Sequence, residues 1–309
     1  MKRIYDLAMT HKLDSDDFFI HCIQRHCAEI KLNFFLIDPH WVEAFYLSLQ
    51  SGEVWPRVLL NMHSEHHQPE ELYHRLVGLA AEKQSYVIDP PDIAQAAFDK
   101  ARLHPILLSA GLRVPPTVIV SREKIADFRL TEAEWATLGG PFVIKPAMGY
   151  GRGGVVLDAT SEKDLLRSMA AWPDSHYLLQ RRIRPREIKG APAYFRVYFV
   201  FGSVWCSWWN CYTDTYRLVS PAEANELNLK ALEEIVRQIA SVSKMNFFST
   251  EIAQTESGEF FVIDYVNDQC HMLSQSANPI IGVPDELVAN VAKRLVEATR
   301  EVIAKKGGV

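Results

Sequence analysis

The 309-residue sequence is poor in cysteine and has no long apolar run, and each absence excludes a class of protein. Its five cysteines are an odd number without disulfide-framework or zinc-finger spacing, which favours reduced thiols over an oxidised or zinc-stabilised domain. No stretch approaches the ~20 apolar residues that span a bilayer. Asp6 and the acidic residues after it also break the pattern of a signal peptide. We therefore expect a cytoplasmic protein without a membrane partner.

An excess of basic residues is absent as well. The net charge of −5 offers no general attraction to nucleic acid or to an anionic membrane, so any anion site must be local. A hydrophobic share of 48% with 23% charged residues is ordinary for a soluble enzyme, and 309 residues are enough for two domains with a sizeable core.

Strand and helix patterns alternate over a first domain, residues 1–91, which ends at Pro90-Pro91. The expected strands cover residues 3–9, 33–37, 57–61 and 85–88. Helical patterns lie between them, the first preceded by the capping residues Asp14, Ser15 and Asp16. This alternation predicts a small parallel sheet.

Residues 92–309 are expected to form a second domain of two lobes, about 113–180 and about 183–309. It opens with a helical pattern over residues 92–112, which Pro105 should interrupt. Ser161 and Asp164 suit a capping box. Strands are expected over residues 117–121, 194–201, 203–209, 247–252 and 259–266, and a last helix from Pro284 to about Ala304.

The stretch from Gly140 to Val155 is the most informative one. A buried strand ends at Lys145, and the glycine-rich loop Gly149-Tyr150-Gly151-Arg152-Gly153-Gly154 leads into a second strand. A lysine at a strand end can meet phosphate oxygens, and glycines can expose N–H groups as an anion nest. The loop is not of the Walker type, and the strand after it fits a dinucleotide fingerprint poorly. On these residues alone, a phosphate-binding flap and a plain β-hairpin both stay open.

Four further segments follow a fixed order. They are Asp99-Lys100 before a Leu-rich helix, Tyr177 to Ile183 before a basic connector, the strand from Phe195 to Gly202, and Glu251 before Phe260 to Asn267. With the glycine-rich hairpin, this order resembles the ATP-grasp superfamily, in particular the glutathione synthetase and RimK-like carboxylate–amine ligases, over residues 85–290. The resemblance implies an α/β protein whose ATP-grasp fold is preceded by a small Rossmann-like parallel α/β domain.

The resemblance implies ATP as cofactor and assigns its contacts. The phosphates would lie between two lysines and under the flap, at Lys100, Lys145, Gly149, Tyr150, Gly151, Arg152 and Gly153. The adenine edge would meet the hinge backbone at Gln180, Arg181, Arg182 and Ile183, where the Gln180 side chain can accept or donate a hydrogen bond. Glu187 would bind the ribose. Arg196 and Arg217, with Lys145, would contact the transferred phosphoryl group.

The resemblance also implies Mg²⁺, or Mn²⁺ in its place, held by Glu251, Asp264 and Asn267 on adjacent strands. The family's last acid and amide are two residues apart, whereas Asp264 and Asn267 are three apart. Either a bulge re-aims Asn267 or it lies past the strand end, and Asp268 is a substitute. By contrast, His63, His66 and His67 suggest a polar loop more than a metal site.

The predicted activity is ATP- and Mg²⁺-dependent ligation of a small carboxylate to an amine or a thiol through an acyl phosphate. A peptide acceptor, a non-catalytic nucleotide-binding module and a homodimer stay open. A kinase of a small polyanion is a further alternative, because the segment from Ile263 to Asn267 partly matches an Ile-Asp-x-Asn motif and the run from Arg181 to Lys189 is basic. No nucleic-acid partner is expected.

Overall fold

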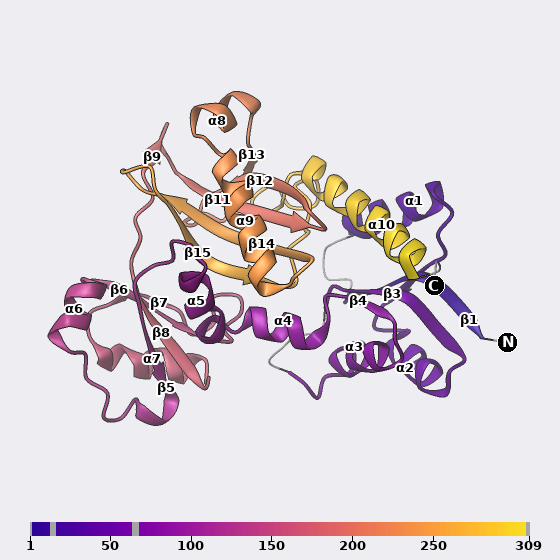
Figure 1. Ribbon diagram of the computed structural model, residues 1–309, viewed down its shortest axis with the longest axis horizontal. Coiled ribbons are helices and arrows are strands. Elements are labelled where there is room, and N and C mark those ends of the chain that lie inside the picture. Colours follow the sequence, from indigo (N-terminus) through magenta and orange to yellow (C-terminus); the bar gives the residue numbers. More distant parts are fainter. Residues whose placement is uncertain (1, 13–16, 64–67, 307–309) are drawn as a thin grey trace.

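The computed structural model describes residues 2–12, 17–63 and 68–306. The expected capping residues Asp14, Ser15 and Asp16, as well as His66 and His67, lie outside the described residues. Three sheets of four or five strands organise this part of the chain, which is a mixed α/β protein (Figure 1). A first sheet belongs to the N-terminal domain, and two antiparallel sheets follow it in sequence.

The N-terminal sheet is parallel, as predicted, with strand order β2-β1-β3-β4. Its strands are β1 (Arg3–Thr10), β2 (Phe34–Ile37), β3 (Val54–Asn61) and β4 (Tyr86–Ile88). Its helices are α1 (Asp17–Glu29), α2 (Val42–Ser51) and α3 (Leu72–Glu82). Helices α2 and α3 pack on one face, and α1 packs on the other together with the C-terminal helix α10 (Asp285–Lys306). The N-terminal sheet is therefore the middle one of three layers.

Two helices connect this domain to the rest of the chain, namely α4 (Pro91–Phe98) and α5 (Lys100–Ser109). The expectation that Pro105 interrupts this segment is wrong, because the break falls at Asp99. The Asp99 carboxylate accepts hydrogen bonds from the backbone N–H groups of Ala101 and Arg102 and so caps α5. Pro105 lies inside α5, which continues past it. The cap places Lys100 at the first position of α5.

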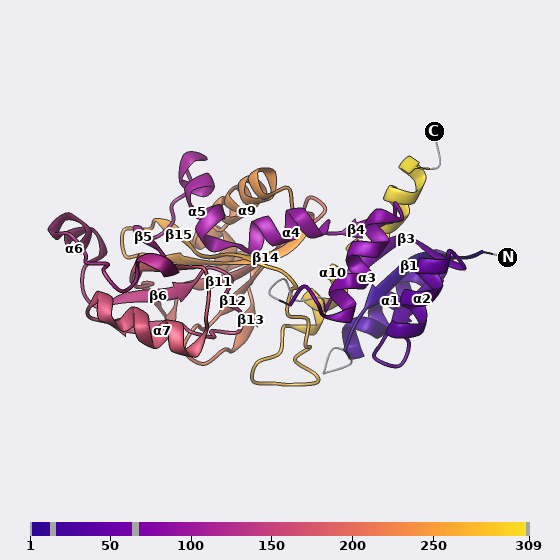
Figure 2. The ribbon, with the colours of Figure 1, turned by 90° about the horizontal axis from the view of Figure 1, so that it is seen from below.

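The second sheet forms the flap lobe and has the order β5-β8-β6-β7. It contains β5 (Thr117–Ser121), β6 (Phe142–Pro146), β7 (Val156–Ala159) and β8 (His176–Arg181). The helical segments are η1 (Arg122–Lys124), α6 (Glu132–Leu138), η2 (Glu162–Asp164) and α7 (Leu165–Ala171). The capping box of Ser161 and Asp164 is confirmed. Helix α7 lies along the outer side of β6, which leaves the inner side to face the third sheet (Figure 2).

The third sheet is antiparallel, with the order β13-β12-β11-β14-β15. Its strands are β11 (Tyr194–Val200), β12 (Ser203–Trp209), β13 (Tyr216–Leu218), β14 (Phe247–Gln254) and β15 (Phe260–Asn267). A short hairpin of β9 (Glu187–Ile188) and β10 (Ala191–Pro192) precedes it, and α8 (Pro221–Glu226) and α9 (Lys230–Ser243) follow β13. Helix α9 packs on the face that carries Phe195 and Val197, so the face with Arg196 is left for the site.

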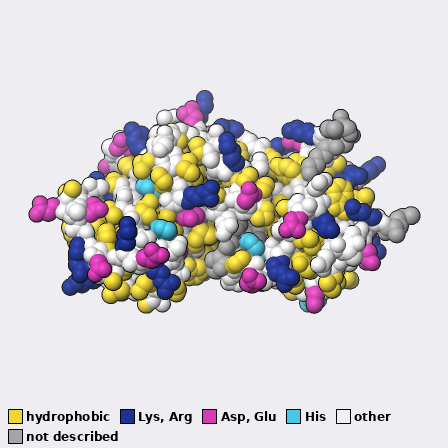
Figure 3. Space-filling view, turned by 60° about the horizontal axis from the view of Figure 1, so that its bottom comes forward, with side chains coloured by type: hydrophobic (Ala, Val, Ile, Leu, Met, Phe, Trp, Pro, Cys, Tyr) yellow, Lys and Arg dark blue, Asp and Glu magenta, His cyan; other side chains and the backbone are white. Residues whose placement is uncertain are grey.

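The surface carries both signs of charge. On the face shown in Figure 3, Lys and Arg side chains are interspersed with Asp and Glu side chains and form no extended basic patch. Among the described residues, no helix combines the length and the apolar character that a membrane span requires.

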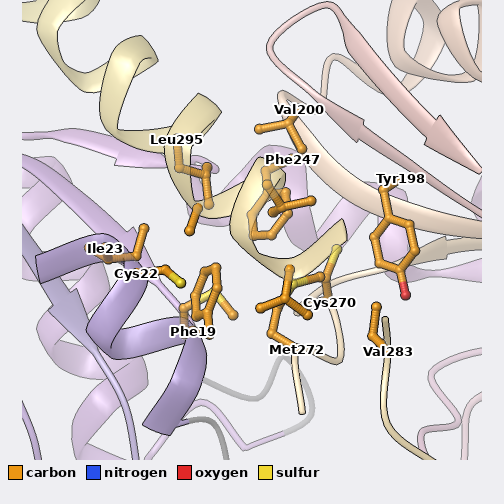
Figure 4. Close-up of a cluster of buried hydrophobic side chains, with 14 of the residues drawn as sticks. Phe19, Cys22, Ile23, Tyr198, Val200, Phe247, Cys270, Met272, Val283 and Leu295 are labelled. Carbon is orange, nitrogen blue, oxygen red and sulfur yellow. The ribbon is translucent and has the colours of Figure 1, made fainter. Parts of the chain in front are cut away.

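One apolar cluster joins the N-terminal domain to the third sheet. Phe19 and Ile23 of α1 and Leu295 of α10 converge with Val200 and Phe247 of the third sheet (Figure 4). Helix α10, the last in the sequence, therefore packs on the first domain in space.

Candidate active site

Two lysines, Lys100 buried and Lys145 partly buried, meet between the second and third sheets. Lys145, near the end of β6, crosses to β15 and donates from Nζ to the Ile263 carbonyl at 2.8 Å. Lys100 donates from Nζ to the Gly149 carbonyl at 3.1 Å, and the same Nζ lies 3.7 Å from Oδ1 of Asp264. The β6 strand end and the capped start of α5 thus bring two cations close to one acidic residue, Asp264.

An arginine–glutamate pair lies beside them on neighbouring strands. Arg196 of β11 and Glu251 of β14 are opposite each other in the register, and Nη2 of Arg196 lies 2.9 Å from Oε1 of Glu251. Tyr194 shares this face because it precedes Arg196 by two residues. Its hydroxyl donates to Oε2 of Glu251 at 3.0 Å. Tyr194 is therefore a site residue that was not predicted, although strand parity could have indicated it.

A bulge in β15 brings the side chains of Asp264 and Asn267 together beside Arg196. The register pairs Asp264 with Glu251 and Asn267 with Ser249, so three steps on β15 match two on β14. The bulge is thus the correct one of the two expected alternatives. With its amide oriented to satisfy its neighbours, Asn267 donates to Oδ2 of Asp264 and accepts from Nη1 of Arg196, both at 3.0 Å.

The charges around Asp264 control its protonation. Burial alone would raise the pKa of this carboxyl, but the charges of Lys100, Lys145 and Arg196 outweigh burial and lower it. Burial lowers the pKa of Lys145, while the charge of Asp264 opposes that shift. A partly buried carboxylate close to three cations stays ionised at neutral pH.

The donor set fits a hard divalent cation. Among the described residues, no three His, Cys, Asp or Glu side chains gather as a metal site, and the candidate set is two carboxylates and one amide. Oδ1 of Asp264 is buried without a hydrogen-bond partner in the described chain. Such an oxygen suits Mg²⁺, whose remaining ligands are phosphate oxygens and water. Asn267 contacts Asp264 directly, which makes it a better candidate than Asp268.

The glycine-rich loop between β6 and β7 combines open N–H groups with close packing. Gly151 and Gly154 have positive φ angles of 55° and 70°, and a Cβ at Gly153 would lie 2.4 Å from the ring of Trp172. In the described structure, the N–H groups of Gly151 and Arg152 make no backbone hydrogen bond. Consecutive N–H groups of this kind suit a phosphate.

The structure does not bring Arg217 to the site, contrary to the expectation. Arg217 pairs with Trp208 in the register and Arg196 pairs with Ser207, so the two arginines lie on opposite faces of the sheet. Nη2 of Arg217 lies 2.7 Å from Oε1 of Glu223, the residue in the capping box of α8.

Arg152 of the flap supplies a second guanidinium on the face of Arg196. The guanidinium carbons of Arg152 and Arg196 lie 5.8 Å and 4.8 Å from the ring centroid of Trp209. Arg152 also forms an ion pair with Asp214, in the turn between β12 and β13, where Nη1 and Oδ2 are 3.2 Å apart. This pair fastens the flap to the third sheet.

The expected hinge spans the end of β8, with Gln180 and Arg181 in the strand and Arg182 and Ile183 after it. The Arg181 side chain points away from Lys145 and donates from Nε to the Thr137 carbonyl of α6 at 2.6 Å. In the described chain, the N–H groups of Arg182 and Ile183 donate no hydrogen bond, which leaves them open to an adenine edge. Glu187 is exposed on β9.

A buried polar chain behind the hinge was not predicted. Nε2 of Gln180 donates to Oγ1 of Thr117 at 2.9 Å and to the Tyr265 hydroxyl at 2.7 Å. The same hydroxyl lies 2.6 Å from Nδ1 of His104. These residues come from β8, β5, β15 and α5, so only the assembled fold reveals the chain.

His104 makes stability pH-dependent. Its burial, helped by the charge of Lys145, lowers its pKa from 6.5 to about 4. Between these values the unfolded chain takes up a proton that the folded protein does not, so stability is lost as the pH falls through this window. We expect a loss of at most about 1.4 kcal/mol per pH unit from this residue. Urea unfolding of the parent and of His104→Asn measures it, and equal pH slopes in the two proteins would contradict the assignment.

No family model and no curated protein matches the sequence. Solved structures do match, over nearly the whole chain. A RimK domain ATP-grasp protein from Sphaerobacter thermophilus is 18% identical, with a TM-score of 0.64 and coverage of 94% of this chain and 98% of that one. D-alanine–D-alanine ligase from Bacillus anthracis, complexed with ATP, is 16% identical, with a TM-score of 0.61 and coverage of 97% and 99%. The ATP-grasp ligase PsnB, complexed with precursor peptide PsnA2 and AMPPNP, is 14% identical, with a TM-score of 0.61 and coverage of 96% and 98%. At these identities the likeness establishes the fold, and the chain has the ATP-grasp fold that its sequence resemblance implied.

Proposed function

We propose that the protein is an ATP- and Mg²⁺-dependent ligase that joins a carboxylate to an amine or a thiol through an acyl phosphate. The observation that carries the proposal is the convergence of Lys100, Lys145, Arg196, Glu251 and Asp264 between two sheets. Two separated cations can neutralise a triphosphate and leave its γ end open to attack. The ligases among the structural neighbours support the same reaction class.

The chain's own groups position and neutralise the reactants. Lys100 and Lys145 hold the phosphates while a substrate carboxylate oxygen attacks the γ-phosphorus, and ADP leaves with the electrons of the broken P–O bond. Arg196 stabilises charge on the transferred phosphoryl oxygens. Asp264, with Glu251 and Asn267, would hold Mg²⁺, which supplies charge neutralisation at phosphate oxygens when bound. The amine or thiol then attacks the acyl carbon, and phosphate departs with the electrons of the C–O bond.

The flap excludes water from this chemistry. An acyl phosphate that meets water is hydrolysed, so the site must close before transfer. The ion pair of Arg152 with Asp214 holds the glycine-rich loop over the third sheet, next to Trp209 and Arg196. We propose that this closed position is the reactive one.

The substrates are small carboxylates and amines or thiols, or a peptide such as the one bound by PsnB. The kinase alternative was motivated by the basic segment from Arg181 to Lys189, but two arginines of this segment bind other parts of the protein. Arg181 binds the Thr137 carbonyl of α6, and Arg186 binds Oε1 of Gln254 at 2.7 Å. A polyanion site at this run therefore has less support than the ligase.

A screen for ADP release tests the proposed function. Purified protein is incubated with Mg-ATP and pairs drawn from amino acids, small peptides and polyphosphates. We expect ADP and phosphate to appear together, only when a carboxylate and a nucleophile are both present, and the ligated product to be visible by mass spectrometry. A stable phosphorylated product without a second substrate would identify a kinase instead. Mg-ATP binding without ADP across the whole panel would reject the ligase.

A further inference from the structure

The side-chain amide of Gln180 has a single orientation, and the proton inventory of its neighbours determines it. Thr117 has one hydroxyl proton, which Oγ1 donates to the Pro115 carbonyl at 2.7 Å. A carbonyl has no proton to give back. Oγ1 of Thr117 must therefore accept from Gln180, so the amide atom beside it is Nε2 and not Oε1.

The second amide proton of Gln180 is donated within the same buried network of hydrogen bonds. Nε2 of Gln180 donates to the Tyr265 hydroxyl, whose own proton can pass to Nδ1 of a neutral His104. Gln180, Tyr265 and His104 are only 2%, 1% and 4% exposed, so water does not replace these partners. Both protons of Nε2 are thus committed inside the protein. Oε1 accepts no hydrogen bond from the described residues and remains for a ligand.

We propose that Thr117 and Tyr265 orient Gln180 so that its carbonyl oxygen, and not its amide N–H, meets the purine, and that this selects a 6-amino purine nucleotide over a 6-oxo one. The inference rests on the proposed ATP site. It makes Thr117, Tyr265 and His104 positioning residues that act through Gln180.

The chemistry of the two purines explains the selection. Adenine carries a donor at position 6 and satisfies an acceptor oxygen. Guanine carries an acceptor there, so two oxygens would face each other without a proton in a site that excludes water. An unpaired buried polar group of this kind typically lowers affinity about 5- to 150-fold. A Gln180 side chain free to rotate would remove the penalty by presenting Nε2 instead.

The test compares the affinities of the full-length protein for the Mg²⁺ complexes of non-hydrolysable ATP and GTP analogues, measured by calorimetry. We expect the parent to favour the ATP analogue by about 100-fold and Thr117→Val to reduce this ratio to about 10-fold or less, mainly through tighter GTP binding. Tyr265→Phe, which removes the other acceptor, should reduce the ratio as well. Thr160→Val, at the exposed residue that follows β7, is the matched control and should keep the parent ratio.

The decisive variant is Thr117→Val combined with Gln180→Glu. A carboxylate presents an acceptor oxygen in either orientation, so we expect this double variant to recover the preference for ATP. A loss of affinity for both nucleotides in equal proportion, with the ratio unchanged in Thr117→Val and Tyr265→Phe, would indicate a purely structural role and overturn the inference. If the ratio is unchanged in both variants but the parent protein still binds the ATP analogue selectively, only this inference fails and the proposed function remains supported. Parent protein that binds neither nucleotide would reject both.

Discussion

Replacing Lys145 with alanine should lower the affinity for Mg-ATP by up to about 150-fold and abolish turnover. A charge-assisted hydrogen bond to a phosphate contributes up to about 3 kcal/mol, which corresponds to a factor above 100. Lys145 is partly buried between two sheets, and its loss also leaves Asp264 and Glu251 with less compensating charge. Calorimetric titration with Mg-ATP measures the affinity, and ADP release measures the turnover.

The control for this variant is Lys163→Ala, which removes a lysine from the exposed surface of the same lobe. It should bind Mg-ATP as the parent does. Circular dichroism and urea unfolding show whether Lys145→Ala remains folded at the assay temperature. Folded Lys145→Ala protein that binds Mg-ATP with parental affinity would show that the role given to Lys145 is wrong.

Asp264→Asn should reduce Mg²⁺-dependent turnover by about 100- to 1000-fold while changing metal-free nucleotide affinity by less than about threefold. The substitution keeps the size of the side chain and removes the charge that three cations surround. ADP release as a function of Mg²⁺ concentration and nucleotide titration in the presence of a chelator give the two quantities. Asp158→Asn, at an exposed position of β7, is the matched control.

Turnover of Asp264→Asn equal to that of the parent would remove Asp264 from the metal ligands. Equal losses of metal-free affinity and turnover would instead assign it a structural role, in which it holds Lys100 and Asn267 in place. The two readouts therefore separate metal binding from local order.

Much of this arrangement follows from short-range sequence features. The parallel sheet, the glycine-rich hairpin and the strands with Arg196, Glu251 and Asp264 were predictable because alternation and turn residues act locally. The helix break was misplaced because Pro105 is a conspicuous helix breaker, whereas Asp99 ends one helix by capping the next. The hydrogen bonds from a capping side chain to the first backbone N–H groups stabilise the start of a helix, and here they determine where α5 begins.

The errors at the site have a different origin. Arg217 was expected beside Arg196, but which face it occupies depends on the register between β12 and β13. A shift of one residue in that pairing would have put it on the other face. The chain from Thr117 through Gln180 to Tyr265 and His104 links four elements that are far apart in sequence. No short-range sequence pattern predicts contacts between residues that are so far apart in the sequence.

The position of α10 has a consequence for synthesis of the protein. Leu7 and Leu60 of the N-terminal sheet lie in the apolar cluster that α10 completes, yet about 220 residues separate the end of β3 from the start of that helix. At typical elongation rates of about 5–20 residues per second, the ribosome needs roughly 10–45 s to make them. During that interval α1 is the helix that packs on this face, and the apolar area that α10 later covers stays exposed in the nascent chain, where a holdase chaperone can shield it.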